Sequence, residues 1–307
     1  MRIVFMGTPA FAVPSLKILL ENNYTIAGVV TVPDKPAGRG QQIISSAVKQ
    51  FAVEHTLEVF QPERLTNGDF QVTLQSLKAD LFVVVAFRIL PPEIFRLPSK
   101  GSFNLHASLL PKYRGAAPIN WAIINGETET GVTTFFLDEK VDTGNIILQA
   151  RVPITPEETA GELYDNLAEV GAEIVLHSVR LIEAGKVSLK SQDHALAIPA
   201  PKIFKDQCRI DWNKKSIEVH NFVRGVSPKP CAFTMYNGTL MNIVRVAIAE
   251  PARNGLPGEI IEAGQRLIVS TGNGAVEILE IQQEGKRKMP AADFLRGSKI
   301  KTGVRFS

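Results

Sequence analysis

The most constraining feature of the sequence is an uninterrupted apolar run over residues 81–86, Leu-Phe-Val-Val-Val-Ala. Polar and apolar residues do not alternate in it, so it does not fit a strand with one face in water. It fits a strand that is covered on both faces, as in a parallel sheet between two helical layers. The fold must therefore bury this segment from both sides.

Shorter β-rich runs surround this segment and alternate with stretches in which apolar residues recur at helical spacing. This alternation predicts an α/β fold with a Rossmann-like, mostly parallel sheet and helices on both faces. In such a sheet, ligands bind beyond the carboxyl ends of the strands. The expected strands cover residues 2–6, 25–32, 81–86, 101–106 and 131–137, and a long amphipathic helix is expected over residues 159–184.

The second half of the sequence has a different pattern, in which short strands are separated by turn signals. Asn237-Gly238 lies between two apolar runs, which is a strong local signal for a two-residue hairpin turn. Further strands are expected over residues 267–269 and 276–281. Together these strands predict a small, OB-like β-barrel.

The length of 307 residues favours two domains over one. Hydrophobic residues make up 45% and charged residues 21% of the chain, which is typical of a globular protein with substantial cores. We expect an N-terminal α/β domain over residues 1–188, a linker over residues 189–207, and a C-terminal barrel over residues 208–307. The net charge of +3 permits an anionic partner without requiring one.

The expected compartment follows from what the sequence lacks. No apolar run approaches the length that spans a bilayer, and the first residues do not form a signal peptide. Cys208 and Cys231 are the only cysteines, too few and too far apart for a disulfide framework or a thiolate metal site. We therefore expect a cytoplasmic protein without a membrane partner.

The candidate chemistry begins with Asn104 and His106 at the end of an expected strand. Side chains alternate along a strand, so these two share one face and Leu105 lies on the opposite, buried face. Buried polar groups need partners, so such a pair requires a reason. An isolated Asn-x-His is more often structural than catalytic. Likewise, Asp142 in an Asp-Thr-Gly sequence is by itself usually only a turn residue.

Taken together, these three residue types suit acyl transfer. An Asn amide can donate a hydrogen bond to an oxyanion, and a His can act as general acid or base near neutral pH. A carboxylate such as that of Asp142 can orient the His. No Gly-x-Ser-x-Gly sequence occurs, so we expect direct attack by a substrate amine and no acyl-enzyme. The other histidines lack metal-ligand spacing, so no metal is expected.

Residues 104–115, Asn-Leu-His-Ala-Ser-Leu-Leu-Pro-Lys-Tyr-Arg-Gly, resemble the signature of the folate-dependent formyltransferases. The resemblance covers nearly the whole chain. Further segments resemble the branch of this family that acts on tRNA. These segments are residues 5–9 at the start, residues 33–40 with Gly-Arg-Gly, residues 222–228, and residues 283–289 and 293–297.

The resemblance implies 10-formyltetrahydrofolate as formyl donor and the α-amino group of methionyl initiator tRNA as acceptor, for translation initiation. It implies that Asn104 and His106 stabilise the tetrahedral oxyanion, with His106 also placed for proton transfer. Asp142 would hold His106 or a water that carries protons away. The N-terminal domain would be the catalytic one and the C-terminal barrel would bind tRNA.

The same resemblance implies a wall for the folate from two loops. Its residues are Phe87, Arg88, Ile89, Leu90, Ser108, Leu109, Leu110 and Pro111. One departure lies within it, since many family members have Tyr-Gly where this chain has Phe87-Arg88. Arg88 adds bulk and charge beside a pocket where Gly is usual, and we expect its side chain to turn outward.

For the tRNA, the resemblance implies contacts from the loop that contains Lys35 and Arg39. This loop is rich in Gly and Pro, and we expect it to be irregular. Further basic residues gather in the C-terminal half, either as an ordinary solvated face or as phosphate contacts. Those expected to bind tRNA are Lys202, Lys205, Lys286 and Arg287. We expect a monomer.

Three readings of the sequence remain open. The first is formylation of methionyl initiator tRNA, which matches motifs in both halves. The second is a folate-dependent formyltransferase that acts on a small amine, such as a nucleotide or sugar precursor, and does not need the Gly38-Arg39-Gly40 loop. The third is a non-catalytic RNA-binding protein, which the joint presence of Asn104, His106 and Asp142 disfavours.

Overall fold

The computed structural model describes residues 1–37, 42–249, 255–298 and 300–307. The chain forms two compact units. The first comprises Met1–Gly115, Gly131–Val152 and Tyr164–Pro199, and the second comprises Ala116–Thr130, Pro153–Leu163 and Ala200–Ser307. Two short segments that interrupt the first unit thus belong to the second unit. The domain boundaries at residues 188 and 208 stay a prediction.

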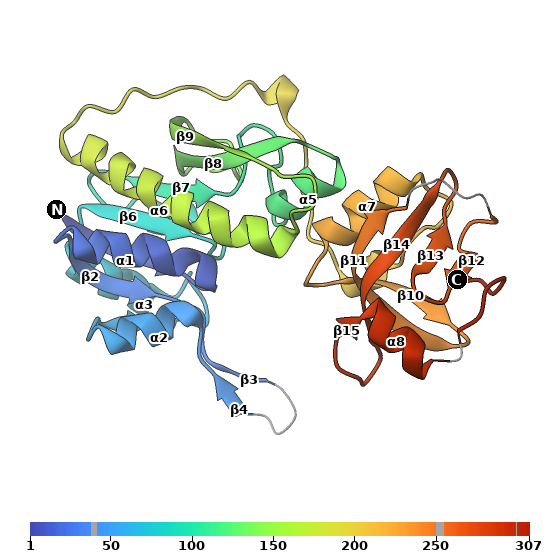
Figure 1. Cartoon of the computed structure of the whole chain (residues 1–307). Helices are drawn as coiled ribbons and strands as arrows, with labels where there is room; N and C mark the ends of the chain where they lie inside the picture. Colours follow the sequence, from blue (N-terminus) through green and yellow to red (C-terminus); the bar gives the residue numbers. More distant parts are fainter. Residues whose placement is uncertain (38–41, 250–254, 299) are drawn as a thin grey trace. The chain divides into compact units, whose positions relative to one another are not determined.

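The first unit contains a seven-stranded sheet with strand order β5-β2-β1-β6-β7-β8-β9 (Figure 1). The five strands from β5 to β7 pair in parallel, whereas β8 runs antiparallel to β7. This confirms the predicted Rossmann-like, mostly parallel sheet. The strands are β1 (Arg2–Gly7), β2 (Thr25–Val30), β5 (Val59–Phe60), β6 (Leu81–Val85), β7 (Ser102–His106), β8 (Glu129–Phe136) and β9 (Ile146–Pro153).

Both faces of this sheet are covered by helices, as the uninterrupted apolar run of β6 requires. On one face, Phe70 and Leu74 of α3 pack into a core with Phe82 and other strand residues. On the other face, Gly171 of α6 approaches β7 so closely that an added Cβ would lie 2.7 Å from Cδ2 of Leu105. The helices of this part of the chain are α1 (Val13–Glu21), α2 (Ala47–Glu54), α3 (Gly68–Ser76), α4 (Pro92–Phe95) and α6 (Ala160–Glu183).

The segment around Lys35 differs from the irregular loop that we expected. Its described residues form an antiparallel ribbon of β3 (Lys35–Ala37) and β4 (Gln42–Ile44), which projects from the end of β2 (Figure 1). Proline is tolerated there because each strand of a two-stranded ribbon has one side without a partner. Residues 38–41, and with them Arg39, lie outside the described part of the chain.

The second unit contains an antiparallel sheet with strand order β10-β11-β14-β13-β12, and β15 pairs with β14. The predicted hairpin is confirmed, with positive φ at both Asn237 and Gly238. The C-terminal residues bond to both outer strands, since Ser307 exchanges main-chain hydrogen bonds with Met235 while Val304 accepts one from Ile260. This closes the sheet into a small barrel. Its strands are β10 (Ala232–Tyr236), β11 (Thr239–Ile248), β12 (Ile260–Ala263), β13 (Leu267–Ser270), β14 (Ala275–Gln283) and β15 (Met289–Pro290).

Helices also contribute to the second unit, although the sequence patterns did not predict them. Val219 and Val223 of α7 pack into the core of the barrel. These helices are α5 (Pro118–Ile124), α7 (Ser216–Gly225) and α8 (Ala291–Gly297). Over the described ranges, no helix of either unit combines the length and apolar character needed to cross a membrane.

Candidate active site

The candidate site lies where β6 and β7 end side by side, with Val85 paired to Leu105. Leu105 faces α6, so alternation places Asn104 and His106 on the opposite face of the sheet. Asn104 is half-buried, and His106 is 7% exposed. A buried imidazole needs a hydrogen-bond partner, and the chain supplies one from the residues that follow β7.

The ring of His106 is fixed by the main chain of the loop after β7. Its Nε2 lies 2.7 Å from the carbonyl oxygen of Tyr113. A carbonyl can only accept a hydrogen bond, so Nε2 carries a proton and donates it. In the neutral imidazole, Nδ1 is then the nitrogen with a free lone pair. This tautomer makes His106 a proton acceptor at Nδ1.

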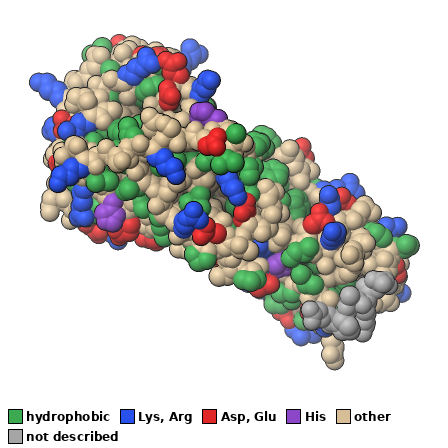
Figure 2. All heavy atoms as spheres, turned by 90° about the horizontal axis from the view of Figure 1, so that it is seen from above, with side chains coloured by type: hydrophobic (Ala, Val, Ile, Leu, Met, Phe, Trp, Pro, Cys, Tyr) green, Lys and Arg blue, Asp and Glu red, His purple; other side chains and the backbone are tan. Residues whose placement is uncertain are grey.

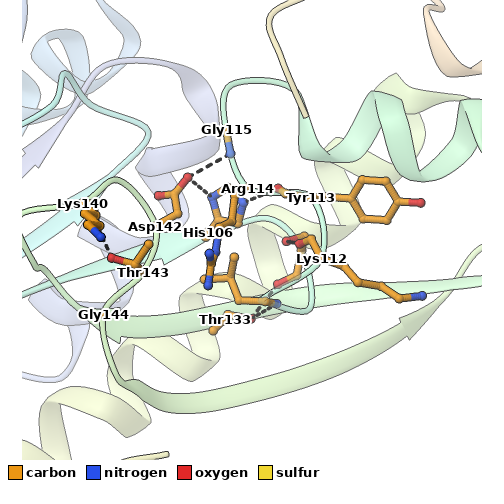
Figure 3. Close-up of polar contacts among 12 residues, drawn as sticks. His106, Lys112, Tyr113, Arg114, Gly115, Thr133, Lys140, Asp142, Thr143 and Gly144 are labelled. Atoms are coloured by element: carbon orange, nitrogen blue, oxygen red, sulfur yellow. Dashed lines mark hydrogen bonds and ion pairs between the residues drawn. The ribbon is translucent and has the colours of Figure 1, made fainter. Parts of the chain in front are cut away.

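Asp142 faces that nitrogen from the loop between β8 and β9. Its Oδ2 lies 3.9 Å from Nδ1 of His106, which is too long for a hydrogen bond but close enough for strong electrostatic attraction to an imidazolium. The same oxygen accepts a hydrogen bond of 2.9 Å from the main-chain N–H of Gly115. Figure 3 shows the Asp142 carboxylate between these two groups. The carboxylate is therefore held by the same loop that holds the imidazole.

Three non-glycine residues around the site adopt left-handed backbone conformations. Ala86 follows β6 with φ of 48°, Tyr113 has φ of 60°, and Asp142 has φ of 56°. Each such conformation costs on the order of 1–3 kcal/mol and persists only where the surroundings enforce it. Strained backbone of this kind concentrates at functional sites. The site is thus built from loops with fixed shapes.

The eight residues predicted to form a folate wall occupy the loops after β6 and β7. In the first loop, Leu90 is buried and Phe87 is half-buried, while Ile89 is 76% exposed. In the second, Ser108 and Leu110 are buried, and Leu109 and Pro111 are half-buried. Both loops begin at the carboxyl ends of adjacent parallel strands, so the structure brings the two groups to the same edge of the sheet.

The side chain of Arg88 lies against the segment after β5. Its guanidinium donates hydrogen bonds of 2.8 Å and 2.9 Å to the carbonyl oxygens of Pro62 and Glu63, and it lies 5.2 Å from the ring centroid of Phe87. Burial lowers the pKa of the guanidinium. These two carbonyls and the aromatic face hold the guanidinium in place. Arg88 thereby fastens the loop after β6 to the segment after β5.

The residues predicted to contact tRNA have different surroundings. Lys35, Lys286 and Arg287 are exposed, and Nζ of Lys202 lies 5.1 Å from the ring of Phe204. Nζ of Lys205, by contrast, donates to the carbonyls of Pro230 and Cys231 and to Oδ1 of Asn242. All three ammonium protons of Lys205 are therefore already used. On the face shown in Figure 2, basic side chains are interspersed with acidic ones.

Sequence reasoning missed three contributors to the site. Tyr113 and Gly115 act through main-chain atoms, which no side-chain pattern reveals. Gln192 lies in the segment that we expected to be a linker, yet its side chain contacts the Asp142 loop. The only sequence signal for the first two was their place in the signature segment after His106.

Comparisons with known proteins agree with this geometry. Residues 1–179 match the formyl transferase family, and residues 202–299 match the C-terminal domain of formyl transferases. The chain is 47% identical to methionyl-tRNA formyltransferase from Bacteroides fragilis, over 97% of this chain and 95% of that protein. It is 45% identical to methionyl-tRNA formyltransferase from Alkaliphilus oremlandii, over 99% and 98% of the two chains.

A solved structure has the same architecture. The N-formyltransferase from Helicobacter canadensis, in complex with folinic acid and dTDP-3-aminofucose, is similar with a TM-score of 0.67 and 25% identity. The match covers 92% of this chain and 98% of that one. Two family models, full-length relatives and the conformation around His106 lead to one conclusion. The chain belongs to the formyl transferase family and, within it, to the methionyl-tRNA formyltransferases.

Proposed function

We propose that this protein transfers the formyl group of 10-formyltetrahydrofolate to the α-amino group of methionyl initiator tRNA, for translation initiation. Relatives named for this activity match the chain at 43–47% identity over nearly its full length. The observation that carries the chemistry is the fixed His106, whose Nε2 is bonded to Tyr113 while Nδ1 faces Asp142. This arrangement presents a proton acceptor beside an anion at the edge of the sheet.

The proposed reaction begins with attack of the amine nitrogen on the formyl carbon. A nitrogen–carbon bond forms, and the electron pair of the carbonyl double bond moves to oxygen. Nδ1 of His106 takes the proton that the amine loses, and the Asp142 carboxylate 3.9 Å away stabilises the resulting imidazolium. The electron pair on oxygen then re-forms the carbonyl double bond while the bond from the formyl carbon to the donor nitrogen breaks, and His106 returns the proton to that nitrogen.

In this proposal, Asn104 stabilises the oxyanion. It precedes His106 by two residues, so both side chains lie on the same face of β7. Its amide is half-buried, which strengthens a hydrogen bond to a developing negative charge. A pre-positioned donor of this kind contributes about 100- to 1000-fold to the rate.

Exposed apolar side chains in the loops of the site can be covered by the rings of the formyl donor. Ile89 is 76% exposed in the loop after β6, and Val141, which precedes Asp142, is 52% exposed. Large apolar side chains at such exposure gain stability when a ligand covers them, at about 25 cal/mol per Å². Polar main-chain groups in the adjacent loops can meet the donor's ring edge. The donor is a co-substrate in this proposal.

The test is an acceptor competition. The purified protein is incubated with 10-formyltetrahydrofolate labelled in the formyl group, and with methionyl initiator tRNA, uncharged initiator tRNA or a dTDP-amino sugar. We expect label on the methionyl-tRNA only, because uncharged tRNA lacks the attacking amine. Label on the sugar alone would refute the proposed acceptor and favour formyl transfer to a small amine.

A further inference from the structure

Gln192 is a buried amide in an otherwise exposed segment of the first unit. Its side chain is 8% exposed, whereas the neighbouring residues Lys190, Ser191 and Asp193 are exposed. An amide removed from water in an irregular segment is costly unless its donors and acceptor are satisfied. The burial of Gln192 therefore calls for specific partners.

Those partners lie on the two loops that form the candidate active site. Nε2 donates hydrogen bonds of 3.0 Å to the carbonyl of Asp142 and 2.8 Å to that of Gly144. Oε1 accepts bonds from Nη2 of Arg114, at 2.6 Å, and from Nε of the same guanidinium, at 3.2 Å. One side chain thus joins the β8–β9 loop to the loop after β7.

The two joined segments carry the groups that surround His106. Arg114 lies between Tyr113, whose carbonyl binds the imidazole, and Gly115, whose N–H binds the Asp142 carboxylate. Figure 3 shows this turn of the chain around His106. The distance between Asp142 and His106 therefore depends on how the two loops are held together.

The Asp142 loop needs such a restraint because its backbone is strained. Asp142 has φ of 56°, which a non-glycine residue adopts only when its surroundings enforce it. Gly144 is packed so tightly that an added Cβ would lie 1.7 Å from the carbonyl oxygen of Phe136. The carbonyls to which Gln192 donates are those of these two residues, at both ends of the tight turn.

We propose that Gln192 is a positioning residue for catalysis, which holds the Asp142 carboxylate at its working distance from Nδ1 of His106. This role rests on the proposed formyl transfer. Gln192 touches neither His106 nor any reacting atom in this scheme, and it acts through Asp142 and Arg114. It extends the catalytic machinery into the segment between the two family domains.

The test uses Gln192→Glu, which keeps the shape of the side chain and the acceptor for Arg114. The substitution removes both N–H donors, and its carboxylate is repelled by the carbonyl oxygens of Asp142 and Gly144. We expect kcat to fall about 10- to 100-fold, because small displacements of catalytic groups have effects of this size. KM for both substrates should change less than about twofold. Gln75→Glu, at an exposed position of α3 with the same change in charge, is the matched control and should keep the native kcat.

Two further variants distinguish positioning from general stability. Gln192→Ala should also lower kcat, and it replaces Gln192→Glu if that variant does not fold. In an Asp142→Asn background, Gln192→Ala should cause less than a twofold additional loss, because its effect is transmitted through the Asp142 carboxylate. Native kcat in the folded Gln192 variants, or a full additional loss in the double variant, would overturn the proposal. An inactive wild type would instead refute the proposed function.

Discussion

The surroundings of His106 and the basic residues of the second unit represent two ways of preparing a protein surface for a substrate. At His106, the loop after β7 and the segment around Gln192 supply the partners that fix the ring, the carboxylate and the backbone of the Asp142 loop. At Lys286 and Arg287, the side chains are exposed in the turn between β14 and β15. The groups around His106 are therefore already in position before a substrate binds, whereas Lys286 and Arg287 provide only positive charge.

This difference follows from what each region has to do. Transition-state stabilisation requires donors and acceptors placed to a fraction of an ångström. Strained loops and buried amides at this site hold the groups at such positions. Phosphate contacts position a nucleic acid through long-range attraction and tolerate mobile side chains. Lys205 differs from Lys286 and Arg287, because its ammonium is hydrogen-bonded within the second unit.

The largest effect on kcat is expected for Asn104→Ala, in the region around His106. Loss of one oxyanion donor should lower kcat about 100- to 1000-fold and leave KM for methionyl-tRNA nearly unchanged. Steady-state kinetics with both substrates measure this, with circular dichroism to confirm folding. A kcat within threefold of the wild type would remove Asn104 from the mechanism.

A smaller effect, on tRNA binding, is expected for the exposed basic residues of the second unit. Lys286→Ala combined with Arg287→Ala should weaken binding of the tRNA several-fold at moderate salt, with kcat at saturation unchanged. The dependence of log affinity on log salt should become shallower by about one for each lost phosphate contact. Lys100→Ala, an exposed lysine just before β7, is the control. An unchanged salt slope in the double variant would exclude these residues from tRNA binding.

The sequence predicted the elements that depend on local pattern. The unbroken apolar run of β6 required a sheet with two covered faces, and the Asn237-Gly238 turn specified its hairpin. The ribbon around Lys35 was not predicted, because the pairing of β3 with β4 is made by the main chain and Pro36 interrupts the strand signal.

In the site, the alternation of side chains predicted that Asn104 and His106 share a face, and the resemblance added Asp142. The partners that fix His106 and Asp142 could not be predicted. They are main-chain atoms of Tyr113 and Gly115, which strained turns bring close to these side chains. Gln192 was hidden for a related reason. A single polar residue in an irregular segment carries no periodic signal, and only the folded chain shows that it is buried.

The tautomer of His106 is the feature on which the proposed chemistry depends most. It is tested directly by nitrogen-15 NMR of the imidazole in the neutral state, with Tyr113 and Asp142 intact and His106→Ala used to assign the resonances. We predict a protonated Nε2 and an unprotonated Nδ1, because the Tyr113 carbonyl can only accept. A neutral ring protonated at Nδ1 would contradict the proposal, since His106 could not then accept the proton of the amine at the nitrogen beside Asp142.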